Sequence, residues 1–121
     1  MRLSKAEEQL MQYLWKLERA YMKDFLEAYP EPKPATTTLA TVLKRLKDKG
    51  FIDYTVHGKA REYRALISKE DYFSTHMSGL IKTFFNDSTA QFASFFTQKS
   101  DLSKEELEDL KELIDSEIKK K

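Results

Sequence analysis

The chain of 121 residues contains no cysteine, which excludes disulfide scaffolds, thiolate metal sites and cysteine nucleophiles. It has no apolar run of about 18 residues and no apolar segment typical of a signal peptide, so no membrane insertion is expected. Glycine is scarce, with three residues, and no glycine-rich phosphate loop is present. These absences favour a cytoplasmic protein that binds no cofactor.

Candidates for catalysis and metal binding are equally few. The two histidines, His57 and His76, have no metal-ligand spacing between them, so no metal site is predicted. The acidic pairs within 105–109 fit the first turn of a helix, favoured by the helix dipole, better than they fit paired catalytic carboxylates. The sequence therefore predicts a protein that is not an enzyme and has no catalytic residue.

The net charge of +1 conceals an uneven distribution. Residues 1–66 carry 13 Lys and Arg against 9 Asp and Glu, whereas residues 67–121 carry 8 against 11. Within 33–64 the count is 8 against 3. A basic first half followed by an acidic second half is typical of a nucleic-acid-binding segment joined to a segment with another role.

The most informative stretch is 36–50, which has the periodicity of an amphipathic helix. Its apolar stripe consists of Leu39, Val42, Leu43 and Leu46. Gly50 fits the residue that ends a helix. The other side carries short hydroxyls and then cations, a combination suited to base edges and phosphates in a DNA major groove. The candidate contacts are Thr37, Thr38, Thr41, Lys44 and Arg45. An ordinary amphipathic surface helix is the alternative.

Two helices are expected before this stretch. Ser4 and Glu7 form a capping-box pattern that opens a helix over about 5–18. We expect its buried stripe to include Leu10, Leu14 and Leu17, with Met11 and Trp15 beside them. A second helical pattern over 21–29 ends at the proline-rich segment 29–34.

After the threonine-rich helix the hydrophobic period changes to two. Ile52, Tyr54 and Val56 alternate with polar residues, and Gly58 begins a tight turn before a second strand over 61–66. Three helices followed by a hairpin is the element order of a winged helix-turn-helix domain, which we place at 1–68. Cations at the hairpin tip are expected to contact phosphates. They are His57, Lys59 and Arg61.

Residues 69–121 are expected to form three further helices, over about 69–86, 88–98 and 104–120. They hold too many large apolar side chains to leave exposed, yet the segment is too small to enclose them alone. Burial against a second copy of the chain is the simplest solution, and packing against the first domain is the alternative. The fold class expected is mainly α with a small β-hairpin, with this region as a helical dimerisation domain. The predicted dimer contacts are Leu80, Phe84, Phe92, Phe96, Leu107, Leu110, Ile114 and Ile118.

Placed in order, these segments resemble the penicillinase-repressor family, the bacterial BlaI/MecI/CopY regulators. The resemblance covers nearly the whole chain and depends on an ordered set of segments, none of them specific alone. They are Leu3-Ser4-Lys5-Ala6-Glu7, Met11-Gln12-Tyr13-Leu14-Trp15, Thr37-Thr38, Thr41-Val42-Leu43-Lys44-Arg45-Leu46, Lys49-Gly50-Phe51-Ile52, Tyr63-Arg64 and Lys104-Glu105-Glu106-Leu107-Glu108-Asp109-Leu110.

The resemblance implies a homodimeric repressor that binds double-stranded DNA at a dyad operator, often one that controls resistance genes. In the beta-lactam branch a membrane-bound sensor metalloprotease signals and the repressor is cut within its tail. By position, the threonines at 37, 38 and 41 match recognition-helix contacts, and Lys44 and Arg45 match that helix's basic end.

The chain departs from the family pattern at three places. Staphylococcal members have an arginine where this chain has Ala40, which indicates a different operator. Their cleaved Asn-Phe bond has Phe95-Phe96 as its nearest counterpart here. The copper-sensing branch has a C-terminal cysteine motif, and this chain has no cysteine. Two further hypotheses stay open: a winged-helix regulator that responds to a small ligand, and a winged-helix adaptor that contacts proteins without binding DNA.

Overall fold

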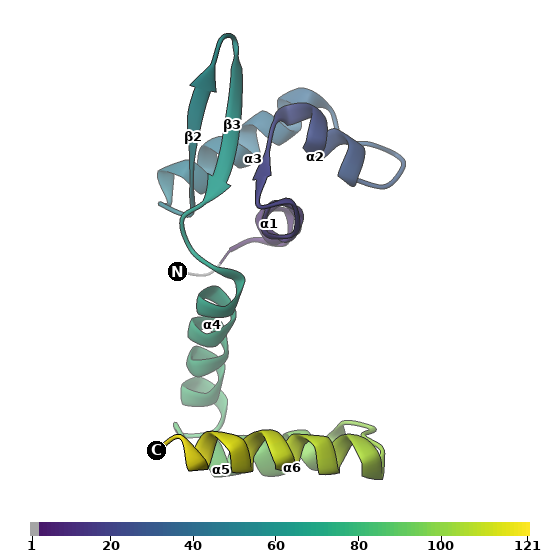
Figure 1. Ribbon diagram of the computed structural model, residues 1–121, viewed down its shortest axis with the longest axis vertical. Helices are drawn as coiled ribbons and strands as arrows, with labels where there is room; N and C mark the ends of the chain where they lie inside the picture. Colours follow the sequence, from purple (N-terminus) through teal and green to yellow (C-terminus); the bar gives the residue numbers. More distant parts are fainter. Residues whose placement is uncertain (1–2) are drawn as a thin grey trace. The chain divides into compact units, whose positions relative to one another are not determined.

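The computed structural model describes residues 3–121, which form two compact units; the first ends at His76 and the second is Met77–Lys121. Figure 1 labels the elements in chain order. The predicted fold class, a winged helix-turn-helix followed by a helical C-terminal region, is confirmed. The elements are α1 (Lys5–Leu17), β1 (Arg19–Ala20), α2 (Met22–Ala28), α3 (Thr36–Asp48), β2 (Ile52–His57), β3 (Ala60–Ala65), α4 (Lys69–Phe84), α5 (Thr89–Lys99) and α6 (Lys104–Lys119).

Helix α1 begins at the predicted capping box. The Ser4 side chain accepts a hydrogen bond from the Glu7 backbone N–H, and the Glu7 side chain accepts one from the Ser4 backbone N–H. Leu10 and Leu14 are fully buried, but the prediction for Leu17 is wrong, since 41% of this residue is exposed. Leu17 is the last residue of the helix, and the chain turns into β1 at Glu18, whose φ is 70°.

Helix α3 places its predicted stripe in the core, where Leu39, Val42, Leu43 and Leu46 are buried. Its C-terminal end closes with two backbone hydrogen bonds, from Gly50 N–H to the Lys47 carbonyl and from Phe51 N–H to the Leu46 carbonyl, both 3.0 Å. This pattern needs a left-handed residue at Gly50, whose φ is 83°. Leu46 and Phe51, which make one of these bonds, are both buried in the core.

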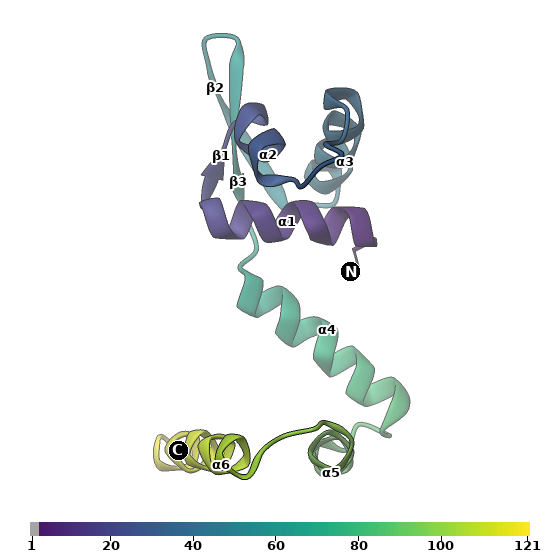
Figure 2. The ribbon, with the colours of Figure 1, turned by 90° about the vertical axis from the view of Figure 1, so that its right-hand side faces the viewer.

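The sheet has the order β1-β3-β2 and is antiparallel throughout. Strand β1 was not predicted, because two residues are too few to show a period of two. The predicted alternation of Ile52, Tyr54 and Val56 forms β2, but burial falls along it, since Ile52 is buried and 59% of Val56 is exposed. The reason is visible in Figures 1 and 2, where the hairpin tip extends beyond α2 and α3 and so leaves the core.

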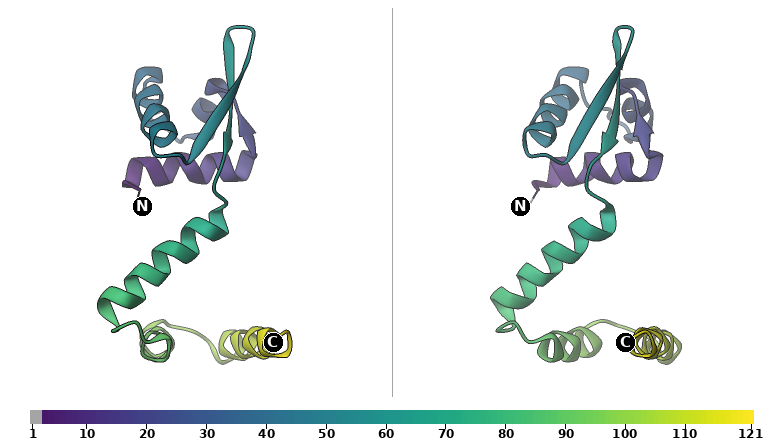
Figure 3. Two further views of the ribbon diagram at one scale, coloured as in Figure 1. Left: turned by 90° about the vertical axis from the view of Figure 1, so that its left-hand side faces the viewer. Right: turned by 60° about the vertical axis from the view of Figure 1, so that its left-hand side comes forward.

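The start of α4 belongs to the first unit. The ring of Tyr72 packs beside Trp15 and Phe51, with centroids 5.9 and 5.8 Å away. Its hydroxyl accepts a hydrogen bond from Leu3 N–H and donates one of 2.7 Å to the Glu8 carboxylate. Figure 3 shows α1, which supplies Glu8 and Trp15, running beneath α3 and the hairpin. The first unit ends at His76, whereas the functional boundary predicted at 68/69 stays a prediction.

In the second unit, α5 begins at a Ser88 cap and α6 at a capping box of Ser103 and Glu106, close to the predicted starts at 88 and 104. Phe85, Phe92 and Phe95 form an aromatic cluster, with centroid distances of 5.4 and 5.6 Å from the Phe85 ring. Helix α6 has no buried residue within this single chain. Its apolar stripe is therefore left open to solvent.

Candidate nucleic-acid interface

The outer face of α3 presents all five predicted contact residues to solvent: Thr37, Thr38, Thr41, Lys44 and Arg45. The Thr41 hydroxyl donates to the Thr37 carbonyl at 3.1 Å, so the lone pairs of its oxygen stay available to accept a hydrogen bond. Lys44 forms an exposed ion pair of 2.9 Å with Asp48, one turn further on. An exposed pair of this kind contributes little stability, so the Lys44 ammonium can exchange Asp48 for another anion at small cost.

The hairpin formed by β2 and β3 is the wing. All three predicted cations at its tip, His57, Lys59 and Arg61, are exposed. His57 Nε2 lies 3.4 Å from Glu62 Oε1 across the hairpin, so a carboxylate already faces the imidazole. The Arg61 guanidinium carbon lies 4.5 Å from the ring centroid of Tyr54, which places this cation over an aromatic face.

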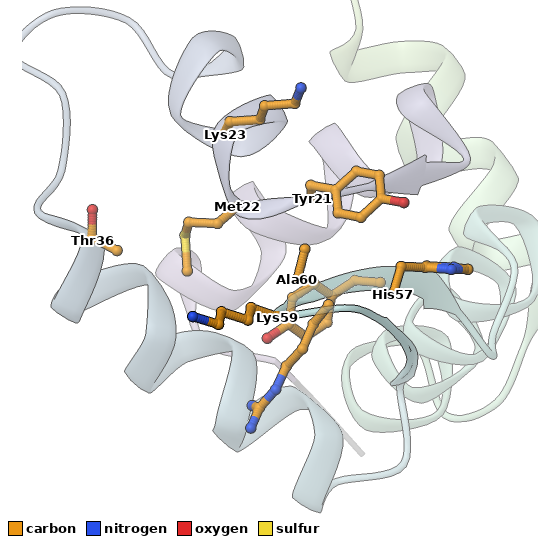
Figure 4. Close-up of a pocket in the computed structure, with 9 residues that line it drawn as sticks. Tyr21, Met22, Lys23, Thr36, His57, Lys59 and Ala60 are labelled. Carbon is orange, nitrogen blue, oxygen red and sulfur yellow. The ribbon is translucent and has the colours of Figure 1, made fainter.

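A groove of about 720 Å³ lies between the N-terminal end of α2, the first residue of α3 and the wing. Its cationic lining comes from Lys23, Lys59 and Arg61, and Met22 and Tyr63 give it apolar walls. Figure 4 shows Lys59 extending from the wing on the side of α3, with Met22 between the wing and Thr36. The predicted wing residues and the start of α3 are thus brought to one concave surface. The contribution of Lys23 was missed, since nothing in the second helix pattern indicates that it faces the wing.

A second group of charges lies where the C-terminal end of α3 meets the wing. Asp53 is shared by Lys47, at 3.9 Å, and Arg64, at 3.6 Å, and Arg64 also donates to the Thr55 hydroxyl at 3.1 Å. Lys47 is not among the contact residues that the sequence predicts. No local pattern indicates that Lys47 meets the wing, because that contact depends on how the hairpin packs against α3.

Over residues 3–121, the side chains of His, Asp and Glu form no group of three or more that could hold a metal ion. Within the same residues, every helix falls short of the length or apolar character that a membrane span requires.

Three helices packed on a small antiparallel sheet, with a polar helix face beside a basic hairpin, define a winged helix-turn-helix protein. The chain belongs to the penicillinase repressor family, whose family model matches residues 3–116. Family membership supports the function of a transcriptional repressor and favours a regulator over an enzyme.

Two relatives have modest identity but nearly complete coverage. The chain is 26% identical over 113 residues to the methicillin resistance regulatory protein MecI of Staphylococcus aureus (strain N315), which covers 93% of this chain and 92% of that protein. It is 22% identical over 120 residues to the penicillinase repressor of Bacillus licheniformis, with 98% and 94% covered.

Proposed function

We propose that this protein is a cytoplasmic repressor that binds a dyad operator in double-stranded DNA as a homodimer. In this proposal α3 enters the major groove, the three threonines face base edges or phosphates, and Lys44 and Arg45 contact the backbone. The wing residues His57, Lys59 and Arg61 contact flanking phosphates. The observation that carries the proposal is the solvent exposure of this whole set on the two elements that a winged helix uses for DNA.

The second part of the proposal is dimerisation through residues 69–121. The apolar side chains of α6 are unusually exposed for a single chain, with Ile114 at 53% and Ile118 at 63%. Such a stripe favours burial against a partner, and an identical helix of a second copy offers a complementary apolar face. The proposed contacts are Leu80, Phe84, Phe92, Phe96, Leu107, Leu110, Ile114 and Ile118.

The third part concerns release from DNA by cleavage in the C-terminal region, with a membrane-bound sensor metalloprotease as the source of the signal. The candidate bond, Phe95-Phe96, lies inside α5 and not in a loop. Proteases cleave extended chain, so α5 must open locally before this bond can be cut. Helix α5 has only 11 residues and no buried residue. Its local unfolding is therefore expected to require little free energy.

The test is to select bound duplexes from a random pool and to measure affinity for the selected duplex and for a random duplex at two salt concentrations. We expect a marked preference for the selected duplex and a steep loss of affinity with salt. Sedimentation of the same samples is expected to give a dimer at micromolar concentration. No binding to any duplex would contradict the proposal and favour the protein-contacting adaptor.

The groove beside the wing favours a second candidate, a regulator that responds to a small ligand. Its volume falls within the range of small-molecule sites, and its lining combines apolar walls with cations. A ligand there would compete with DNA, because Thr36 and the wing line the same groove. A small anionic molecule that lowers operator affinity without cleavage of the chain would support this candidate.

A further inference from the structure

The ring of Tyr54 lies between cations that come from two different elements. The Arg61 guanidinium carbon of β3 is 4.5 Å from the ring centroid, and Lys47 Nζ of α3 is 5.6 Å from it. The two cationic groups are therefore at most about 10 Å apart, since both distances are measured to the same point. One aromatic side chain thus links the recognition helix to the wing.

The position of this ring is itself fixed by the core. Tyr54 is directly opposite Tyr63 in the hairpin register, and the two rings meet edge to face at 5.5 Å. Tyr63 is buried and packs on Phe25, with ring centroids 6.1 Å apart. Aromatic side chains have few rotatable bonds, so this chain of contacts holds the Tyr54 ring with little freedom. The cations that rest on it are positioned before any ligand arrives.

The charges around the ring are unbalanced. Asp53 is the carboxylate that faces Lys47, at 3.9 Å, and it is also shared with Arg64. Within residues 3–121, Arg61 has no carboxylate within 4.0 Å. Lys47 and Arg64 therefore share one carboxylate and Arg61 pairs with none among these residues, so positive charge is in excess where α3 meets the wing. An anion placed between Lys47 and Arg61 would relieve their mutual repulsion.

We propose that Lys47 and Arg61 form a clamp that binds a single phosphate of the DNA backbone, with Tyr54 as the residue that positions both cations. The inference rests on the proposed function and adds a binding site at the C-terminal end of α3. A phosphate has several acceptor oxygens, so it can accept a forked pair of hydrogen bonds from the guanidinium and a further one from the ammonium. Lys47 exchanges its long contact with Asp53 for the phosphate, and Arg64 keeps that carboxylate paired.

The test measures the salt dependence of binding, using a duplex of about 30 base pairs and random sequence, since phosphate contacts do not depend on sequence. The variants are Lys47→Gln, Arg61→Gln and the double substitution. Loss of a single shared phosphate is expected to lower the slope of log K against log salt by about 0.9 in the double variant. Each single variant is expected to change the slope less, since the other cation still neutralises that phosphate. Lys16→Gln, on α1, is the matched control and is expected to leave the slope unchanged.

A slope change near 1.8 in the double variant would mean two separate phosphates and would overturn the clamp. No change would overturn it as well. If the wild-type chain binds no duplex at low salt, both the proposed function and the clamp are refuted. Wild-type binding with either of the two contrary slopes refutes the clamp alone.

The role of Tyr54 is tested by the coupling between the two cation substitutions. In the wild-type background, and with Tyr54→Phe, the double variant is expected to lose at least threefold less affinity than the product of the two single losses. With Tyr54→Leu this coupling is expected to disappear, because the ring that aligns the cations is gone. Circular dichroism of each variant checks that it is folded. Coupling that persists with Tyr54→Leu in folded protein would show that Tyr54 does not position the cations.

Discussion

Lys49 Nζ lies 2.7 Å from Glu7 Oε1, and this contact ties the C-terminal end of α3 to the first turn of α1. Only 1% of Glu7 is exposed, and the same oxygen accepts the Ser4 backbone N–H at 2.8 Å. Glu7 Oε2 has no hydrogen-bond partner among residues 3–121. One carboxylate therefore both caps α1 and anchors the C-terminal end of α3.

Glu7→Gln is expected to lower the free energy of unfolding at pH 7 by about 1–3 kcal/mol, because it removes a charged hydrogen bond in a buried place. Burial raises the pKa of Glu7, but hydrogen bonds from Lys49 and Ser4 outweigh it and hold the pKa below its ordinary value of 4.5. A lowered pKa in the folded state gives stability that is present above the unfolded pKa and is lost as pH falls through the folded pKa.

Urea unfolding at pH 7 and below pH 4 measures this effect. The wild-type protein is expected to lose more stability on acidification than Glu7→Gln does. The control is Glu27→Gln, since Glu27 is exposed on α2. Equal acid sensitivity of wild type and Glu7→Gln would contradict the role of this carboxylate.

Thr38→Ala and Thr41→Ala test whether α3 reads bases. If the hydroxyl contacts a base edge, each substitution is expected to reduce the difference in binding free energy between operator and random duplex by about 1–3 kcal/mol. Binding to random duplex is expected to change little. Fluorescence anisotropy with both duplexes gives the ratio, and equal losses on the two would show that these hydroxyls only position the backbone.

Sequence patterns predicted most of the fold because the strong local signals agree with the packing. The stripe that begins at Leu39, the Ser4 capping box and the turn at Gly58 all act over a few residues, and all three are confirmed. The features that were missed are non-local. Strand β1 exists only through its pairing with β3, and the link between Lys47 and Tyr54 depends on how a helix meets a hairpin. The predicted DNA and dimer contacts stay predictions.

Leu110→Asp and Ile114→Asp are expected to convert a dimer into a monomer, because an aspartate would bring an unpaired charge into the proposed apolar interface. Sedimentation velocity over a concentration series measures the change. Ser116→Asp places the same charge on the opposite side of α6 by the 100° helical spacing, and it is expected to leave the dimer intact. A wild-type chain that is monomeric at micromolar concentration would contradict the proposed assembly.

Tyr72→Phe is expected to lower the free energy of unfolding by about 1–2 kcal/mol, because Leu3 N–H and the Glu8 carboxylate both lose a hydrogen-bond partner. Tyr72→Leu also removes the ring beside Trp15 and Phe51, so a larger loss is expected. Thermal unfolding of the two variants separates the hydroxyl from the ring. Equal stability of Tyr72→Phe and wild type would show that water replaces the hydroxyl at no cost.

The proposed release from DNA is tested by cutting the purified dimer at a protease site engineered into 98–101. Removal of α6 is expected to weaken dimerisation by several kilocalories per mole, at about 1.5–3 kcal/mol for each apolar side chain that leaves the interface. The fragment keeps α3 and the wing but loses the gain from two linked half-sites. Its operator affinity is therefore expected to fall by orders of magnitude. A fragment that binds as tightly as the uncut protein would favour the ligand-responsive mechanism.

Ala40 leaves room for a longer side chain on the outer face of α3. It is exposed on the polar face of α3, between Thr37 and the cations, and it presents only a methyl group there. Alanine is the best helix former, and exchange for a long side chain costs only a few tenths of a kilocalorie per mole in an exposed helix. A longer side chain can therefore replace Ala40 at little loss of stability. Under the proposed function, a gene duplicate could come to bind a different operator by one substitution at Ala40, while its core, its wing and residues 69–121 stay as they are.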